Sequence, residues 1–162
     1  YIVLINHQCA WETIFFYFFL SPVSAVVKKA LLYVPLAGWG FALLGPIMLN
    51  RKNKVQSFKK LLHDGADRLK QGFNLMLYPE GSRTEITGSK KFSKSGAMIA
   101  AQNNYPILPI AHNAGSFITK HFMIKRTGTI HIKIGAPLIS KGQTMDELYT
   151  QSTNWIIENA NA

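Results

Sequence analysis

The sequence predicts an α/β fold in which helices flank a mixed, mostly parallel sheet. Short, continuous apolar runs at 1–5, 73–77 and 107–111 have the composition of strands that are buried on both faces. Between the first two of these runs, residues 54–71 carry apolar side chains at helical spacing. Strands that alternate with helices along one chain are typical of layered α/β domains.

The first third of the chain alternates short elements. Residues 1–5 are apolar and include β-branched side chains, so they predict a buried strand. Residues 11–20 are apolar and long enough for a helix. Residues 23–27 and 47–49 are short apolar runs that predict strands, and 35–44 between them predicts a short helix.

The rest of the chain continues the alternation. The helix at 54–71 ends at Gly72, and the strand at 73–77 follows it. Residues 78–94 are rich in Gly, Ser, Thr and Lys and predict a loop. The remaining expected elements are helices at 96–103 and 146–158 and strands at 107–111 and 129–134. Because no repeat or linker interrupts the pattern, we expect one domain over residues 1–162.

Composition limits the classes of partner. The formal net charge is +10, which suits an anionic membrane surface or a polyanionic substrate. Lys and Arg are scattered and no nucleic-acid-binding motif is present, so we expect no nucleic-acid partner. A single cysteine, Cys9, excludes an internal disulfide and a cysteine-built metal site. The chain enters an apolar run at Tyr1, which suggests that its natural N-terminus, and with it any membrane anchor, lies upstream.

A histidine and an acid follow the first predicted strand. His7 and Glu12 are five residues apart, which on one regular helix would place them about 140° apart. If His7 lies in the turn before the helix and Glu12 in its first turn, the two side chains can meet. Glu12 would then accept a hydrogen bond from Nδ1–H of His7 and leave Nε2 as a base. A structural His–Glu pair would have the same spacing.

Two further segments offer groups that bind phosphate. The run Tyr78-Pro-Glu-Gly-Ser-Arg-Thr84 follows the strand at 73–77. In it Gly81 lets the backbone approach a ligand, Ser82 offers a hydroxyl and Arg83 a bidentate guanidinium. Glu80 would accept from ligand hydroxyls or hold Arg83. Arg51, at the end of the strand at 47–49, is a second phosphate candidate.

Taken together and in order, these blocks resemble the glycerolipid acyltransferase family. Asn6, His7 and Glu12 match its Asn-His-x4-acid block, although aspartate is the more frequent acid. Residues 45–51 resemble its Gly-x-x-Phe-Ile-x-Arg block, 78–83 its Phe-Pro-Glu-Gly-Thr-Arg block, and 107–110 its apolar block around proline. Met48, Leu49, Tyr78, Ser82 and Cys9 depart from the usual residues without removing a group that the chemistry needs.

The resemblance implies a glycerol-3-phosphate acyltransferase-like fold and acyl transfer from acyl-CoA or acyl-carrier protein to lysophosphatidic acid, which gives phosphatidic acid. It implies His7 as the base, Glu12 as the group that orients it, and Arg51 and Arg83 as ligands of the acceptor phosphate. No cofactor and no metal is required. We expect the protein at the cytoplasmic face of a membrane with anionic lipid, in a bacterium the inner membrane. Another lysophospholipid, or glycerol-3-phosphate itself, is the alternative acceptor.

Two rival interpretations stay open on the sequence. Cys9, close to His7, would make a covalent nucleophile, although a small buried side chain is the simpler expectation. A non-enzymatic, peripheral membrane-binding module would use the aromatic run at 15–19 with the lysines. That run has no polar face, which favours a core or the wall of an acyl groove. Among the other histidines, only His112 is expected near the site, because it follows the apolar block around Pro109.

Overall fold

The computed structural model describes residues 1–33, 37–50, 53–84, 87–120 and 123–160. Its strands are β1 (Ile2–Ile5), β2 (Val23–Lys28), β3 (Ile47–Leu49), β4 (Asn74–Leu77), β5 (Ile107–His112) and β6 (Ile132–Ile134). Its α-helices are α1 (Trp11–Phe19), α2 (Ala37–Leu43), α3 (Lys54–Lys70), α4 (Ser95–Asn103) and α5 (Met145–Ala160), with short 3₁₀ turns at Lys29–Tyr33 and Ala114–Ser116.

The described strands form one six-stranded sheet in the order β3-β2-β4-β1-β5-β6. Every neighbouring pair is parallel except β5 and β6, which are antiparallel. The expected mixed, mostly parallel sheet is therefore confirmed. The strand expected at 129–134 is wrong in its length, because only Ile132–Ile134 pair with β5.

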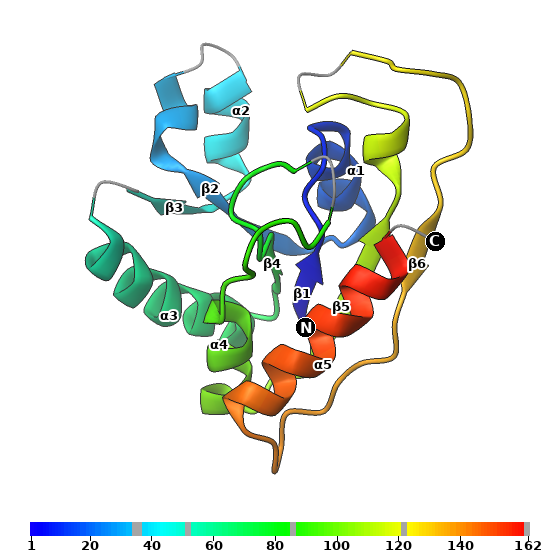
Figure 1. The fold of residues 1–162 in the computed structure, drawn as a ribbon. Coiled ribbons are helices and arrows are strands. Elements are labelled where there is room, and N and C mark those ends of the chain that lie inside the picture. The colour runs from blue at the N-terminus through cyan, green and yellow to red at the C-terminus, as the bar shows by residue number, and fades with distance from the viewer. Residues whose placement is uncertain (34–36, 51–52, 85–86, 121–122, 161–162) are drawn as a thin grey trace.

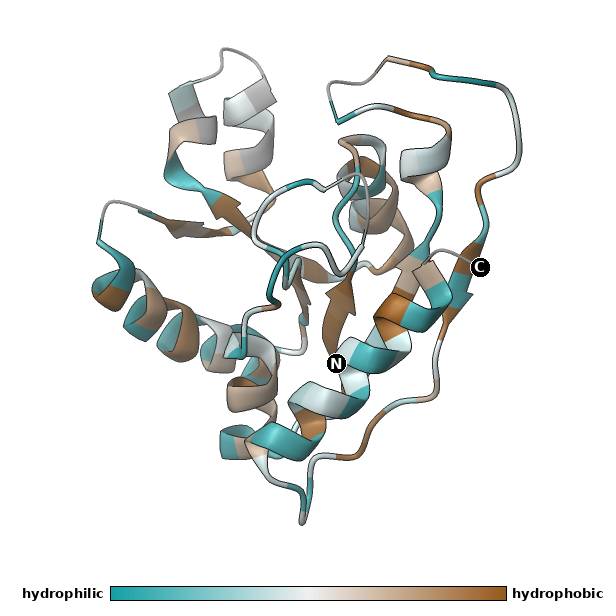
Figure 2. Ribbon diagram, in the orientation of Figure 1, coloured by the Kyte–Doolittle hydropathy of each residue, from teal (hydrophilic) through white to brown (hydrophobic). Residues whose placement is uncertain are grey.

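Helices cover both faces of the sheet (Figure 1). Alternate side chains of β1 point to opposite faces, so Ile2 and Leu4 pack against α3, α4 and α5, whereas Val3 and Ile5 pack against α1. All four are almost fully buried, and each such side chain contributes about 1.5–3 kcal/mol through the hydrophobic effect. In Figure 2, β1 is hydrophobic along its length, as expected of a strand buried on both faces. The helix α3 carries both hydrophilic and hydrophobic residues, as expected of a helix with one face exposed.

Local sequence explains where the helices begin and how closely they approach. The side chain of Asn53 caps α3 by accepting from the backbone N–H of Gln56 at 3.1 Å. Gly96 brings α4 close to the sheet, because a Cβ at this position would lie 2.7 Å from Leu4 Cδ2. Within the described ranges, none of the helices is both long and apolar enough to cross a bilayer.

The aromatic run of α1 divides between core and surface. Phe16 is fully buried and packs in the core between α1 and the sheet. Phe18 is 82% exposed, and Phe19 is exposed as well. The expectation of a core or groove position is thus correct for Phe16 and wrong for Phe19, while Phe18 lines a surface pocket.

Candidate active site

The site lies where β1, β4 and β5 end. These strands are neighbours and parallel, so their carboxyl ends meet at the same edge of the sheet. His7 follows β1, the 78–84 loop follows β4, and His112 is the last residue of β5. The backbone N–H of Thr84 donates to the carbonyl of His7 at 2.8 Å, which ties the first two segments together.

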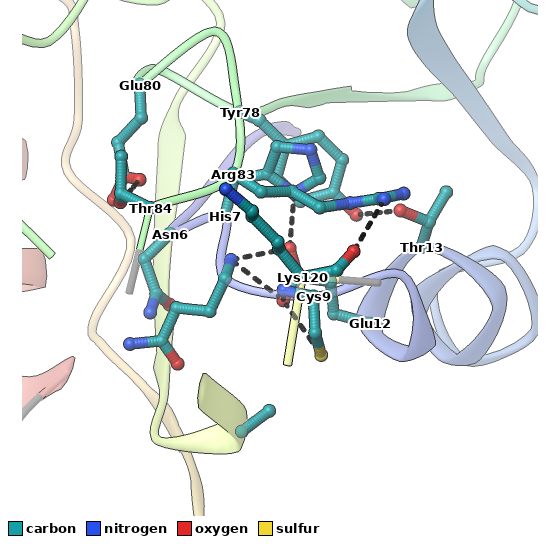
Figure 3. Close-up of polar contacts among 12 residues, drawn as sticks. Asn6, His7, Cys9, Glu12, Thr13, Tyr78, Glu80, Arg83, Thr84 and Lys120 are labelled. Atoms are coloured by element: carbon teal, nitrogen blue, oxygen red, sulfur yellow. Dashed lines mark hydrogen bonds and ion pairs between the residues drawn. The ribbon is translucent and has the colours of Figure 1, made fainter. Parts of the chain in front are cut away.

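His7 and Glu12 meet as the turn geometry predicts. His7 lies in the segment between β1 and α1, and Glu12 lies in the first turn of α1. Nδ1 of His7 contacts Oε1 of Glu12 directly (Figure 3). The carboxylate therefore takes Nδ1, and within the described part of the chain no residue hydrogen-bonds Nε2. The side chain of His7 is 15% exposed, so the ring is not fully covered.

Glu12 is completely buried yet densely hydrogen-bonded. The backbone N–H groups of Gln8 and Cys9 each donate to its carboxylate at 3.1 Å. On the second oxygen, Nε2 of His112 lies 3.0 Å away. Burial alone raises the pKa of Glu12, but hydrogen bonds from His112 and His7 outweigh it and lower the pKa to about 2. Glu12 is therefore an anion at physiological pH.

The imidazole ring of His7 is also oriented by a stacking contact on one face. It stacks on the ring of Tyr78, with the ring centroids 4.1 Å apart and the planes 22° from parallel. The hydroxyl of Tyr78 donates to Thr13 on α1 at 3.4 Å. Burial raises the pKa of Tyr78, so its hydroxyl stays neutral and does not compete as a base. A stacked, hydrogen-bonded imidazole is oriented before any substrate arrives.

The loop after β4 has the features expected of a ligand loop. Gly81 adopts a φ of +68°, a conformation that favours glycine, and its Cα faces open space. Ser82 accepts from Lys90 Nζ at 2.7 Å, and Arg83 is exposed, with Nη1 donating to the carbonyl of Lys120 at 3.0 Å. Glu80 is turned inward, where it accepts from the hydroxyl of Thr84.

One expectation for the charged residues, a contact between Glu80 and Arg83, is wrong, and one, the role of Arg51, stays a prediction. Glu80 does not hold Arg83, because its carboxylate is buried in the loop while the guanidinium extends outward to the carbonyl of Lys120. The second phosphate candidate, Arg51, lies outside the described residues, so its convergence with Arg83 stays a prediction.

Cys9 is a buried side chain behind the carboxylate of Glu12. Its sulfur lies 3.7 Å from Oε2 of Glu12. Burial and the charge of Glu12 raise the pKa of the thiol to about 11, so the thiolate is scarce near neutrality. The environment favours the packing interpretation of Cys9 over a nucleophile.

Sequence reasoning missed the role of Asn6. Its side-chain amide donates to the carbonyl of His112 at 2.9 Å and accepts from the N–H of His112 at 3.0 Å, which joins the ends of β1 and β5. The amide also donates to Thr87 Oγ1 at 3.0 Å. The sequence signals for this residue are its position beside His7 and its place in the Asn-His-x4-acid block, and neither indicates a contact with β5. In the described ranges, no three His, Cys, Asp or Glu side chains are grouped to hold a metal ion.

A mostly apolar pocket of about 500 Å³ opens on the surface of α1. It is lined by Ile14, Tyr17 and Phe18 of α1, with Ser21 and Leu44. Ile14 follows Glu12 by two residues on α1, a rotation of about 200°, so the pocket lies on a different face of the helix from the carboxylate.

Comparisons with known proteins identify the family of the chain. The family model described as Acyltransferase matches residues 1–113. A 1-acyl-sn-glycerol-3-phosphate acyltransferase of Pseudomonas aeruginosa is 38% identical over 160 residues, which is 97% of this chain and 62% of that protein. The enzyme of the same name from Saccharomyces cerevisiae is 28% identical over 91% of this chain and 50% of its own length.

The fold also matches a solved structure. The crystal structure of the 1-acyl-sn-glycerophosphate acyltransferase PlsC from Thermotoga maritima superimposes with a TM-score of 0.80 and 24% identity, covering 99% of this chain and 64% of that one. The chain thus spans between half and two thirds of the length of these relatives.

Proposed function

We propose, on the premise that this chain belongs to the acyltransferase family, that it transfers a fatty acyl group from a thioester to the free hydroxyl of 1-acylglycerol-3-phosphate. The product is phosphatidic acid, and the donor is acyl-CoA or acyl-carrier protein. The relatives from P. aeruginosa and S. cerevisiae carry this activity in their names. The observation that carries the proposal is the His7–Glu12 pair, in which Glu12 engages Nδ1 and the partly exposed ring keeps Nε2 for a substrate hydroxyl.

The chemistry follows from this pair. A hydroxyl is a weak nucleophile near neutral pH, so His7 Nε2 takes its proton as the oxygen attacks the thioester carbonyl. The ionised carboxylate of Glu12 stabilises the imidazolium that forms. The tetrahedral intermediate then collapses, the C–S bond breaks, and the imidazolium returns the proton to the departing sulfur. This direct transfer needs no cofactor and no covalent acyl-enzyme intermediate.

The loop after β4 is the proposed acceptor site. Arg83 offers its guanidinium to the acceptor phosphate, and Gly81 and Ser82 bring the backbone and a hydroxyl beside it. Glu80 lies at the same loop and supports its conformation through Thr84. Arg51 is proposed as a second phosphate ligand on its sequence position alone.

The apolar pocket on α1 and the exposed apolar side chains are the proposed sites of contact with lipid. We assign the acyl chain to the apolar pocket on α1, because Ile14, Tyr17 and Phe18 present aliphatic and aromatic surface there. Exposed Phe18, Trp39 and Leu43 together with the net charge of +10 support contact with an anionic membrane. The cytoplasmic face of the membrane, in a bacterium the inner membrane, is the proposed location.

The test is an acyl-transfer assay of the full-length protein with His7→Ala. The substitution should lower the rate by ~10²–10⁴-fold, the usual contribution of a positioned base. His63→Ala, on the exposed face of α3, is the matched control and should keep the rate. A folded His7→Ala protein with near-normal turnover would refute the mechanism.

The same assay identifies the acceptor. Lysophosphatidic acid, glycerol-3-phosphate and a lysophospholipid without a terminal phosphate are compared, each with acyl-CoA and acyl-carrier protein as donors. Preference for glycerol-3-phosphate or the other lysophospholipid would reassign the acceptor within the same chemistry. No transfer in any combination, with retained binding to anionic vesicles, would favour a non-enzymatic membrane module.

A further inference from the structure

A second histidine lies against the carboxylate that orients His7. His112, at the end of β5, is 1% exposed, and its Nε2 lies 3.0 Å from Glu12 Oε2 and 3.1 Å from the carbonyl oxygen of Asn6. Its other ring nitrogen, Nδ1, lies 3.3 Å from the backbone nitrogen of Ala114, which can only donate. Since Nδ1 must accept, Nε2 carries the proton in the neutral ring. This N–H is directed at both the carboxylate of Glu12 and the carbonyl oxygen of Asn6.

The ring of His112 is fixed in place by its backbone. Both the N–H and the carbonyl of His112 are hydrogen-bonded to the side chain of Asn6, at 3.0 and 2.9 Å. The ring centroid of Phe16 lies 6.1 Å away on the α1 side. His112 therefore presents its Nε2–H to Glu12 from a rigid strand end, whereas Glu12 reaches it on a flexible side chain.

Besides the backbone N–H groups of Gln8 and Cys9, few groups around Glu12 can donate to its carboxylate. The titratable groups that face its carboxylate are His7, His112 and Cys9, and Tyr78 and Glu80 lie near enough to sense its charge. The thiol of Cys9 and the phenol of Tyr78 have raised pKa values and carry no positive charge, and the carboxyl of Glu80 adds a like charge when ionised. Among these groups only the two histidines offer ring N–H donors to the buried anion.

The length of the acid adds a geometric reason. Glutamate has one more methylene than the aspartate that is frequent at this position in the family, and so one more rotatable bond. With Oε1 on His7 and Oε2 beside His112, each oxygen has an imidazole partner, and the additional bond is immobilised.

We propose that His112 is a positioning residue for acyl transfer: by presenting Nε2–H to Oε2 of Glu12, it holds the carboxylate aimed at His7. This inference rests on the proposed function of His7. His112 does not touch the reactants; it acts through Glu12.

The test compares His112→Leu, which fills similar volume without a donor, with His112→Gln, whose amide NH₂ can donate toward Glu12 from a similar place. Ser152→Ala, which removes a buried hydrogen bond to Leu148 on α5, controls for a general loss of stability. The full-length variants are assayed from pH 5 to 9 with acyl-CoA and lysophosphatidic acid, and kcat and KM are determined separately.

The expected result is a change in both rate and pH profile. His112→Leu should lower kcat by about 10- to 100-fold, the order expected when a catalytic group loses its alignment. The acid limb of its kcat/KM profile should move to higher pH, because a carboxylate that has lost one of its donors attracts the proton on His7 more strongly. The KM for the thioester should change little. His112→Gln should retain most of the wild-type kcat, and the acid limb of its kcat/KM profile should lie at the wild-type pH.

A His112→Leu protein with the wild-type acid limb, and a rate no lower than that of Ser152→Ala, would overturn the inference. Equal impairment of the Leu and Gln variants with an unmoved limb would assign His112 to packing and would overturn it as well. Failure of the proposed function looks different: the unaltered protein shows no transfer, or His7→Ala keeps the rate.

A second measurement does not depend on turnover. In ¹⁵N NMR of the full-length protein at neutral pH, His112 should have a protonated Nε2 and a bare Nδ1. The opposite tautomer would leave Nε2 without a proton beside the carboxylate and would overturn the inference whether or not the protein transfers acyl groups.

Discussion

We expect Glu80→Gln to raise the free energy of unfolding at alkaline pH. The side chain of Glu80 is 7% exposed, and among the described residues its Oε1 has no hydrogen-bond partner. Oε2 accepts from the hydroxyl of Thr84. A glutamine keeps this acceptor and removes the charge, so it resembles the protonated form of the native side chain.

The magnitude follows from the pKa of the carboxyl. Burial is the main cause that raises the pKa of Glu80 from the ordinary value of 4.5 to about 7. A group whose pKa is higher in the folded state contributes stability that is complete below pH 4.5 and is lost as the pH rises through 7. The difference between 4.5 and about 7, at about 1.4 kcal/mol for each pH unit, sets an upper limit of about 3.5 kcal/mol on the loss.

Urea unfolding at each pH from 5 to 9 measures this difference. The free energy of unfolding of Glu80→Gln, relative to that of the unaltered chain, should rise between pH 5 and 8 and stay constant above pH 8. Glu158→Gln, which removes one negative charge from an exposed position on α5, controls for net charge. A constant difference between Glu80→Gln and the unaltered chain over the whole range would refute the reasoning. Acyl transfer by Glu80→Gln should fall, because the residue lies in the proposed acceptor loop.

Three further predictions concern the proposed catalytic and acceptor groups. Glu12→Gln should cost more activity than Glu12→Asp, because an amide does not stabilise the imidazolium of His7; equal losses would show that charge is not the role of Glu12. Cys9→Ala and Cys9→Ser should both keep most activity in the transfer assay, whereas two inactive variants and an acyl adduct trapped on Cys9 would establish a covalent route. Arg83→Ala should weaken acceptor binding by about 1.5–3 kcal/mol in steady-state kinetics, and Arg83→Lys should also impair it. A rise in the donor KM alone would instead place Arg83 at the acyl-carrier site.

Much of the fold is predictable from the sequence because it depends on local patterns. The apolar run at 1–5 is typical of a strand buried on both faces, and β1 covers Ile2–Ile5, all of them buried. The helical spacing that begins at Lys54 gives α3, which ends at Lys70 before Gly72. The contact between His7 and Glu12 was also predictable, since a turn and one helical turn suffice to bring them together.

The tertiary structure alone decided what surrounds that pair. His112 reaches Glu12 because β5 lies beside β1 in the sheet, and strand order depends on long-range packing that no local pattern encodes. The inward turn of Glu80 and the exposure of Phe18 depend likewise on which neighbours fill the space around them. The sequence by itself predicted most of the elements and the contact between His7 and Glu12. Only the fold determined that a second imidazole lies against the same carboxylate, because that contact joins the first turn of α1 to the end of β5, two segments far apart in the chain.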